Sequence, residues 1–285
     1  MILITGASGQ VGCAVIRALQ AEGLETRALV HSEGGAARVR AAGASEVVVA
    51  DMENKADLET AFAGTDAVYH IAPAAHPREE ELGRRILEVA LKYGVYFVYH
   101  SVLHSVLLDL PHHRQKLHME NAVVESGLVY TIVQPAVFMQ MLTPGLETAA
   151  QTGVFPQKFF TGPDTQLNLV ALTDAAQAVA AIFKSGRYRN GSYELCGPEN
   201  ISLQDLQAAL SAVLGREIRT AFISDENFLA RSSADPESYQ AKTLLAMFAH
   251  YNRHSFRGND QVLRWILGRK PVTVEEFLVR TLAQQ

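Results

Sequence analysis

Residues 1–12 of this chain read MILITGASGQVG. A short apolar run leads directly into a glycine loop with the spacing GxxGxxG, and a helical pattern follows. A pyrophosphate needs backbone N–H groups at close range and the positive end of a helix dipole. Gly6 would permit the tight turn, Gly9 would let the backbone approach the phosphates, and Gly12 would let the helix pack close to the strand. The loop predicts dinucleotide binding, with contacts expected from Gly6, Ser8, Gly9, Gln10, Val11 and Gly12.

The chain continues this alternation of strand and helix. The expected strands are residues 2–4, 26–30, 47–49, 67–71, 96–99 and 130–133, and the expected helices are residues 13–22, 36–42, 55–62, 79–93 and 112–126, the last closed by Gly127. Taken alone, the glycine loop is also compatible with a turn that only joins a strand to a helix. The repeated alternation favours nucleotide binding and predicts an α/β fold, a Rossmann-like doubly wound parallel sheet.

After residue 135 the alternation weakens, and short strands are separated by Gly/Pro turns. Two helices remain clear, residues 173–184 and 202–214, each expected to open with a capping residue, Thr173 or Ser202. The tail from residue 225 to 285 has a mostly helical pattern. We expect an NAD(P)-binding Rossmann domain over residues 1–150. A smaller, mainly helical substrate-side region over residues 151–285 is expected to be partly interleaved with it.

Composition excludes several classes of protein. The 285 residues are 48% hydrophobic and carry a net charge of −5, which argues against a nucleic-acid binder held mainly by phosphate contacts. The two cysteines, Cys13 and Cys196, have no CxxC spacing, so neither a disulfide framework nor a structural metal site is expected. No signal segment and no apolar stretch long enough to cross a membrane is found, so we expect a soluble, cytoplasmic protein. No nucleophile elbow or Walker loop supports a hydrolase or a kinase.

The type of dinucleotide depends on the residues after the second and third strands. His31 and Ser32 stand where an Asp or Glu would bind the ribose 2′-hydroxyl of NAD. Both could receive a 2′-phosphate by hydrogen bonding, although a neutral His is a weaker anion partner than Arg. NADP(H) is therefore favoured and NAD(H) stays open. Asp51 and Met52 follow the third strand, where an adenine contact is expected, with a helix N-cap region as the alternative.

Four apolar residues follow the fourth and sixth strands, where the cofactor groove is expected. Flat apolar groups at this edge suit a nicotinamide or an aromatic acceptor, and the candidates are Ala72, Pro73, Pro135 and Phe138. Strand termination and core packing are the alternative roles.

Several segments resemble the NmrA-like atypical short-chain dehydrogenases/reductases. These are TGASGQVG at residues 5–12, residues 50–52, residues 130–135 with Phe138, and residues 168–174. Residues 98–104, VYHSVLH, are similar to the NAD(P)H:quinone oxidoreductase branch, and on the helix over residues 112–127 Lys116 falls on the lysine of that branch. The resemblance implies a Rossmann fold and an NAD(P) cofactor. It implies a reductase less firmly, because some members bind the nucleotide without demonstrated chemistry.

Two residues depart from the family pattern. His31 replaces an Arg that often holds the 2′-phosphate, which weakens the assignment of NADP(H). The Tyr-x-x-x-Lys pair of the short-chain dehydrogenases becomes His112 and Lys116, with no tyrosine.

Three residues are candidates for catalysis. Hydride transfer to a carbonyl or quinone leaves an oxyanion that needs a cation or a proton beside it. Lys116 is the candidate cation, and His112 lies one helical turn before it on the same face. Ser101 follows the fifth strand and could contact the nicotinamide ribose or the substrate. The alternatives are a solvated Lys, a surface His and a turn-forming Ser.

Two functions follow from these residues. The first is an NAD(P)H-dependent oxidoreductase that reduces a small apolar or aromatic carbonyl or quinone acceptor. The alternative is a non-catalytic redox sensor that binds NAD(P) and a protein partner. The glycine loop and Lys116 favour the first, and the missing tyrosine favours the second. No nucleic-acid or membrane partner is expected in either case.

Overall fold

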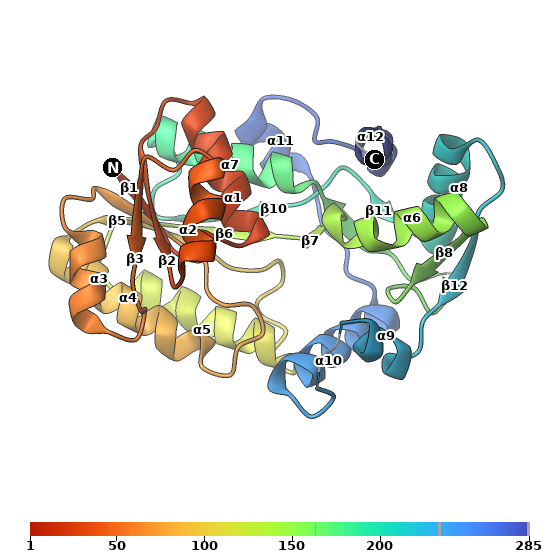
Figure 1. The fold of residues 1–285 in the computed structure, drawn as a ribbon, viewed down its shortest axis with the longest axis horizontal. Coiled ribbons are helices and arrows are strands. Elements are labelled where there is room, and N and C mark those ends of the chain that lie inside the picture. Colours follow the sequence, from red (N-terminus) through yellow and green to blue (C-terminus); the bar gives the residue numbers. More distant parts are fainter. Residues whose placement is uncertain (163, 233–234, 284–285) are drawn as a thin grey trace. The chain divides into compact units, whose positions relative to one another are not determined.

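A computed structural model describes residues 1–162, 164–232 and 235–283 of the chain. Its main sheet has seven strands in the order β10-β6-β5-β4-β1-β2-β3 (Figure 1). The strands are β1 (Ile2–Ile4), β2 (Thr26–Val30), β3 (Glu46–Val49), β4 (Ala67–His70), β5 (Tyr96–His100), β6 (Tyr130–Pro135) and β10 (Gly191–Leu195). Strands β1 to β6 pair in parallel, with Ile4 opposite both Ala28 and Tyr69. The prediction of a Rossmann-like doubly wound parallel sheet is confirmed, whereas β10 was not predicted.

Helices cover both faces of this sheet. On one face lie α3 (Lys55–Phe62), α4 (Glu79–Tyr93) and α5 (Pro111–Glu125), and on the other lie α1 (Gln10–Ala21), α2 (Glu33–Ala41) and α7 (Leu172–Ser185) (Figure 1). A core of apolar side chains fills the space between the sheet and α3, α4 and α5, and includes Leu3, Phe62, Ile86, Phe97 and Val123. A parallel sheet needs this cover because both of its faces are apolar.

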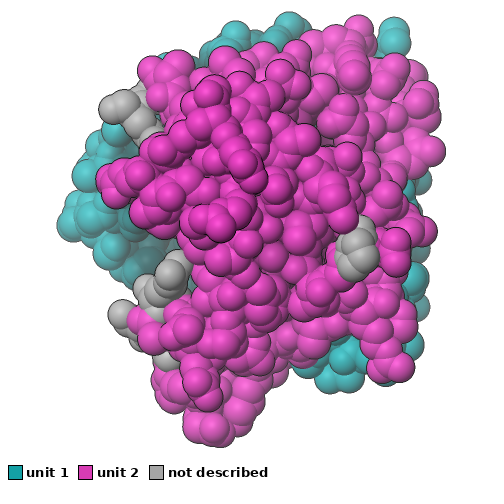
Figure 2. Space-filling view, turned by 90° about the vertical axis from the view of Figure 1, so that its right-hand side faces the viewer, with its two compact units in different colours: residues 1–135, 173–194 teal, residues 136–172, 195–285 magenta. Residues whose placement is uncertain are grey.

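The chain forms two compact units, each made of two segments of the sequence. Unit 1 comprises residues 1–135 and 173–194, and unit 2 comprises residues 136–172 and 195–285 (Figure 2). Residue 150, where a domain boundary was predicted, lies within α6 of unit 2. The chain leaves unit 1 after residue 135 and returns to it at residue 173, so neither unit is a continuous stretch of the sequence.

Unit 2 contains two small sheets, β11-β9-β7 and β12-β8, with helices beside them. Its strands are β7 (Val137–Phe138), β8 (Val154–Gln157), β9 (Leu167–Val170), β11 (Asn200–Ile201) and β12 (Arg219–Phe222). Its helices are η1 (Met139–Leu142), α6 (Thr143–Thr152), α8 (Leu203–Leu214), α9 (Asp225–Ser232), α10 (Tyr239–His254), α11 (Gln261–Leu267) and α12 (Val274–Leu282). The expected helical tail is confirmed for its described residues.

Caps set several helix ends. Ser202 caps α8 in a capping box with Asp205, as its sequence spacing predicted. Gly127 has φ +78° just beyond α5, a conformation that suits a glycine after a helix end. The prediction for Thr173 is wrong, because α7 begins at Leu172 and Thr173 lies inside its first turn. No helix in the described part of the chain is long and apolar enough to cross a membrane.

Candidate functional site

The glycine loop between β1 and α1 is closely packed at two of its three glycines. Gly6 has φ +60°, and a Cβ atom there would lie 2.6 Å from the carbonyl oxygen of Ile71. A Cβ atom on Gly12 would lie 2.4 Å from the carbonyl oxygen of Ala7. Side chains at these positions would clash with the backbone, so the tight turn and the close approach of α1 both require glycine.

Gly9 differs, because its side-chain direction is open. The nearest atom to a Cβ there would be the carbonyl oxygen of Gly6 at 3.4 Å, and Gly9 is exposed. Gly9 is also the N-cap of α1, and no side chain caps this helix end. The first N–H groups of a helix lack partners within the helix, and the helix dipole is positive there. The loop fits the pyrophosphate of a dinucleotide, which would lie on Gly9, Gln10 and Val11.

The residues after β2 lie beside this loop. A Cβ atom on Gly35 would lie 3.3 Å from the Ser8 Cβ, so the loop adjoins the first turn of α2. Ser32 is the N-cap of α2, and its hydroxyl accepts a hydrogen bond from the Gly35 N–H at 3.3 Å. The hydroxyl proton of Ser32 is not used in that contact, and His31 is exposed. Ser32 is therefore placed where its hydroxyl can donate to an anion near Ser8.

The segment after β3 is fixed by hydrogen bonds. The Asp51 carboxylate accepts from the Glu53 N–H at 2.8 Å, and the Asp57 carboxylate accepts from the Asp51 N–H at 3.0 Å. Asn54 is the N-cap of α3, so the N-cap role considered for Asp51 belongs to Asn54. Met52 is half-buried and packs against the apolar core.

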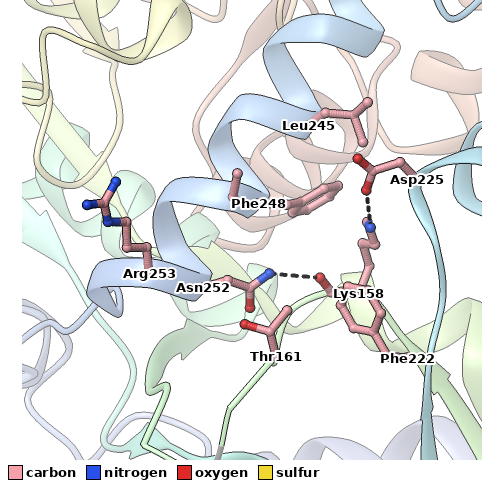
Figure 3. Close-up of a pocket in the computed structure, with 9 residues that line it drawn as sticks. Lys158, Thr161, Phe222, Asp225, Leu245, Phe248, Asn252 and Arg253 are labelled. Carbon is pink, nitrogen blue, oxygen red and sulfur yellow. Dashed lines mark hydrogen bonds and ion pairs between the residues drawn. The ribbon is translucent and has the colours of Figure 1, made fainter.

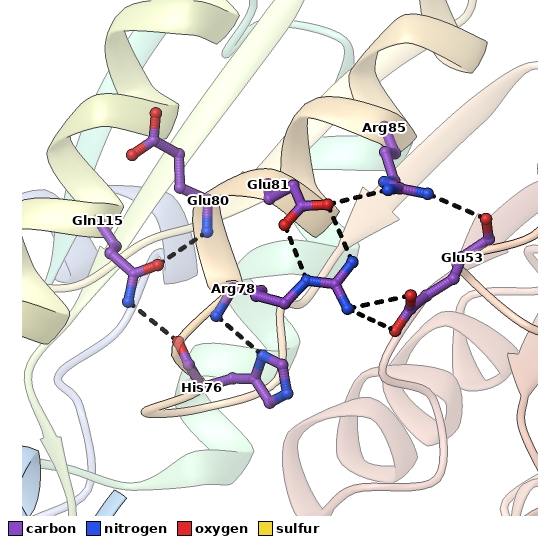
Figure 4. Close-up of polar contacts among 7 residues, drawn as sticks. All are labelled: Glu53, His76, Arg78, Glu80, Glu81, Arg85 and Gln115. Carbon is purple, nitrogen blue, oxygen red and sulfur yellow. Dashed lines mark hydrogen bonds and ion pairs between the residues drawn. The ribbon is translucent and has the colours of Figure 1, made fainter. Parts of the chain in front are cut away.

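A polar network joins this segment to the start of α4 (Figure 4). The Arg78 guanidinium donates to both carboxylate oxygens of Glu53, each at 3.0 Å, and to Glu81 at 2.8 and 2.9 Å. Gln115 of α5 accepts from the Glu80 N–H and donates to the carbonyl of His76, each at 3.0 Å. The ends of β3 and β4 and the helices α4 and α5 are thereby connected at the edge where the cofactor groove was predicted.

The four apolar candidates are placed in different parts of the chain. Ala72 is buried and Pro73 is half-buried after β4, and Pro135 is the buried last residue of β6. The Pro135 carbonyl accepts a hydrogen bond from the Leu103 N–H at 2.9 Å. Phe138 is half-buried in β7 of unit 2, opposite Val170, whereas the other three belong to unit 1.

Lys116 is buried, with 3% of its side chain exposed. Its ammonium donates to the His100 carbonyl oxygen at 2.8 Å, lies 2.9 Å from Glu79 Oε1, and is 5.1 Å from the centroid of the Tyr99 ring. The solvated Lys considered as the alternative is therefore excluded. An ammonium has three N–H donors, and the described part of the chain provides two polar partners for it. One donor remains for a ligand oxygen.

Glu79 links Lys116 to His112. One carboxylate oxygen, Oε1, pairs with Lys116, and the other, Oε2, lies 3.1 Å from His112 Nδ1. Burial alone would raise the pKa of Glu79, but the Lys116 ammonium and the His112 ring outweigh it and lower this pKa to about 2. Glu79 is therefore an ionised carboxylate with 0% of its side chain exposed, and it lies beside both candidate groups on α5.

Ser101 lies in a second buried cluster. Its hydroxyl donates to Glu120, whose carboxylate also accepts from Ser105 at 3.0 Å and from Gln134 at 2.9 Å. The Ser101 hydroxyl proton is used in the hydrogen bond to Glu120, so the Ser101 oxygen can only accept a further hydrogen bond. Ser101 can accept a hydrogen bond from a ribose hydroxyl in this arrangement, but it is not placed to donate one.

Glu79 and Glu120 were missed from the sequence, although helical spacing contains a signal for both. Glu79 shares the buried face of α4 with Leu82, Gly83 and Ile86, at intervals of three and four residues. Glu120 similarly follows Lys116 by four residues on α5. A carboxylate on an apolar helix face needs a partner, and this pattern predicts one without identifying it.

Unit 2 has a cavity of its own, of about 350 Å³ (Figure 3). The buried Lys158 side chain pairs there with Asp225, and its ammonium lies 4.5 Å from the centroid of the Phe222 ring. Phe248 and Asn252 of α10 also line the cavity (Figure 3). No metal-binding cluster of three or more His, Cys, Asp or Glu side chains occurs among the residues that the structure describes.

Comparison with known proteins supports the same family as the sequence motifs. Residues 1–278 match the model of the NmrA-like family. NAD(P)H azoreductase of Xenophilus azovorans is 31% identical over 228 residues, which cover 79% of this chain and 78% of that protein. Quinone oxidoreductase 2 of Escherichia coli (strain K12) is 26% identical over 233 residues, which cover 81% of this chain and 80% of that protein.

A solved structure shows the same fold. The NADPH-dependent quinone oxidoreductase of Escherichia coli complexed with NADPH matches with a TM-score of 0.84 at 24% sequence identity, covering 99% of this chain and 100% of that one. The sequence motifs predict this family, and the family match extends from the glycine loop almost to the end of the chain. The chain belongs to the NmrA-like family.

Proposed function

We propose that this protein is an NAD(P)H-dependent oxidoreductase that reduces a small apolar or aromatic quinone or carbonyl acceptor by hydride transfer. The observation that carries the proposal is the buried Lys116 ammonium, which has one donor left for a ligand and lies at the end of β5. The ends of parallel strands at this edge of a doubly wound sheet are where such folds bind ligands. Relatives named as an NAD(P)H azoreductase and a quinone oxidoreductase support the reductase class.

The cofactor would be held by the glycine loop and the segments after β2, β3 and β4. Gly9 and the first turn of α1 would bind the pyrophosphate, Ser32 and His31 the 2′-phosphate of NADP(H), and Asp51 the adenine side. Ala72, Pro73, Pro135 and Phe138 remain the candidates for contacts with the nicotinamide. When bound, the reduced nicotinamide supplies the hydride. We favour NADP(H) over NAD(H) because no acidic residue stands at position 31 or 32.

The side chains of this chain would handle the charge that develops on the acceptor. Lys116 would stabilise the oxyanion through its remaining N–H donor, and His112 would supply the proton. Ser101 would accept a hydrogen bond from the nicotinamide ribose. His112 and Lys116 would thus have the roles of the Tyr-x-x-x-Lys pair of the short-chain dehydrogenases, with an imidazole in place of the phenol as the proton donor.

Loss of NADPH absorbance in the presence of a panel of quinones, azo dyes and enones tests this proposal. We expect turnover with at least one acceptor and a loss of about 100-fold or more in Lys116→Met, because the cation acts only where charge develops. Glu81→Gln is the matched control, since Glu81 is exposed on α4 and pairs with Arg78 and Arg85. Tight NADPH binding without turnover by any acceptor would contradict the reductase and favour a redox sensor.

A further inference from the structure

Glu79 is a fully buried carboxylate with two polar partners on a different helix. It is the first residue of α4, and both partners lie on α5, one helical turn apart. Oε1 forms an ion pair with Lys116 Nζ at 2.9 Å, and Oε2 lies within hydrogen-bond distance of His112 Nδ1, at 3.1 Å. This division of the two oxygens fixes the distance between the ammonium and the imidazole.

Stability alone does not account for this arrangement. Removing two charges from water is costly, and apolar side chains of similar size often fill such a space at least as favourably. The α4 N-terminus favours an anion, but the half-buried Glu80 and the exposed Glu81 in the same turn already meet that preference. Glu79, in contrast, provides a negative charge in the buried space beside Lys116.

We propose that Glu79 is a positioning residue for the proposed reduction, which holds the Lys116 ammonium and the His112 ring in one fixed arrangement. The inference rests on the proposed function. With the ring nitrogen Nδ1 directed at Glu79, the other ring nitrogen, Nε2, is the one that faces away from the carboxylate. His112 Nε2 has no hydrogen-bond partner in the described part of the chain, and 13% of the side chain is exposed.

The proton transfer then follows from this geometry. In the protonated ring, Nδ1–H donates to Glu79, and the Nε2–H bond breaks as an O–H bond forms on the reduced acceptor. The acceptor takes its two electrons with the hydride, and the neutral ring recovers its proton from water. A carboxylate that orients an imidazole through Nδ1 is the arrangement that serine hydrolases use for the same purpose.

The charged and titratable groups around His112 come from three elements. Glu79 faces it from α4, His100 from β5, and Lys116 and His113 from α5 itself. Glu79 is the one anion among these groups. Because Lys116 and His112 lower the pKa of Glu79 to about 2 against the effect of burial, this carboxylate is ionised at neutral pH.

Nitrogen NMR of the histidine side chains tests the arrangement without cofactor or turnover. In the wild-type protein we expect the neutral His112 ring to carry its proton on Nδ1, assigned by comparison with His112→Asn. In Glu79→Gln the carboxylate charge is lost, and we expect the proton to shift towards Nε2, the tautomer that predominates in free imidazoles. Glu81→Gln, two residues further along α4 and exposed, should leave the wild-type signal unchanged.

Kinetics then separate positioning from binding. In Glu79→Gln we expect kcat to fall by about 10-fold or more, while the KM for NADPH changes by less than about threefold, because Glu79 acts through the groups that handle the transition-state charge. Glu79→Asp keeps the charge and should recover part of the lost kcat. A wild-type kcat in Glu79→Gln, or an equal loss in kcat and in NADPH affinity, would overturn the proposal.

The NMR result also distinguishes this inference from the proposed function. If the wild-type ring carries its proton on Nε2, the positioning role fails even if the enzyme turns over, and this measurement needs no variant of Glu79. If the ring carries its proton on Nδ1 but no acceptor is reduced, the arrangement around Glu79 stands and the proposed reduction fails.

Discussion

The Nζ atom of Lys116 lies 2.8 Å from the backbone carbonyl oxygen of His100, and this contact joins the middle of α5 to the last residue of β5. The same ammonium pairs with Glu79 at the start of α4. One buried cation therefore connects two helices and a strand. A change at Lys116 should affect the folded structure as well as the proposed reaction, and the two effects can be measured separately.

Replacing Lys116 by Met should lower the free energy of unfolding by about 3–5 kcal/mol, because it leaves the buried Glu79 carboxylate without its cation. Urea unfolding measures this change. Lys184→Met is the control, since the Lys184–Glu22 pair is exposed and such pairs contribute about 1 kcal/mol or less. The double variant Glu79→Gln/Lys116→Met should recover part of the loss. An equal loss in the free energy of unfolding for Lys116→Met and Lys184→Met would contradict a stabilising role for the buried pair.

Two glycines of the loop should respond differently to alanine. Gly6→Ala forces a left-handed backbone, at about 1–2 kcal/mol, onto a residue whose Cβ would also lie 2.6 Å from the Ile71 carbonyl oxygen, so both stability and NADPH binding should fall. Gly9→Ala meets no atom closer than 3.4 Å, so stability should change by about 1 kcal/mol or less. Its methyl group would nevertheless point into the space expected for the pyrophosphate.

Calorimetric titration with NADPH and thermal unfolding of the two variants separate these effects. We expect Gly9→Ala to unfold near the wild-type temperature and to bind NADPH about 10-fold or more weakly, a loss of about 1.4 kcal/mol or more. Wild-type affinity in Gly9→Ala would mean that the dinucleotide does not approach the loop at this residue.

Position 31 should control the choice between NADPH and NADH. His31 is exposed at the end of β2, and an Arg there would present a permanent charge and a planar fork to a phosphate. His31→Arg should therefore increase the preference for NADPH over NADH by about 10-fold, and Ser32→Ala should reduce it, because the Ser32 hydroxyl proton is available to an anion. Calorimetry with both cofactors measures the ratio. An unchanged ratio in both variants would place the 2′-phosphate elsewhere.

Stability should fall as the pH drops below neutrality. Burial first, and then the nearby Lys116 charge, lower the pKa values of His70 and His100 from 6.5 to about 3. The folded protein therefore binds fewer protons than the unfolded chain, and the stability present above pH 6.5 is lost as the pH falls towards 3. Each group that titrates fully contributes about 1.4 kcal/mol per pH unit in this window.

Urea unfolding at neutral pH and in mildly acidic buffer checks this dependence. His70→Phe removes one of the two groups and should make the dependence on pH shallower, although it also removes the 2.7 Å contact between His70 and Thr5. The quantity to compare is the slope of the free energy of unfolding against pH, and not its absolute value. Equal slopes in the wild type and in His70→Phe would contradict the predicted effect.

Local signals predicted most of unit 1. Apolar runs, capping residues and glycines lie close to the elements that they define, so the six parallel strands and the helices between them could be placed from the sequence. Strand β10 could not, because its residues are mostly half-buried or exposed and it joins the sheet next to β6, far away in the sequence. Its pairing depends on contacts that no short stretch encodes.

The candidate site was also predicted only in part, because some of its contacts are local in the sequence and others are not. Lys116 and His112 are four residues apart, so helical spacing alone places them on one face. Glu79 lies 33 residues before His112, and Ser101 and its partner Glu120 belong to different elements. Only packing of α4 against α5, and of α5 against the sheet, brings such carboxylates to their partners.

The division of each unit into two segments has a consequence for synthesis of the chain. Phe183 of α7 packs edge-on against Tyr69 of β4 and Tyr96 of β5, at ring-centroid distances of 6.4 and 5.7 Å. On the ribosome, these two tyrosines are made long before Phe183, and β6 is an unpaired edge until β10 emerges. The nucleotide-binding unit therefore cannot finish folding cotranslationally until residue 194 has left the exit tunnel, and a fragment that stops at residue 150 would expose an aromatic face and an open sheet edge to aggregation.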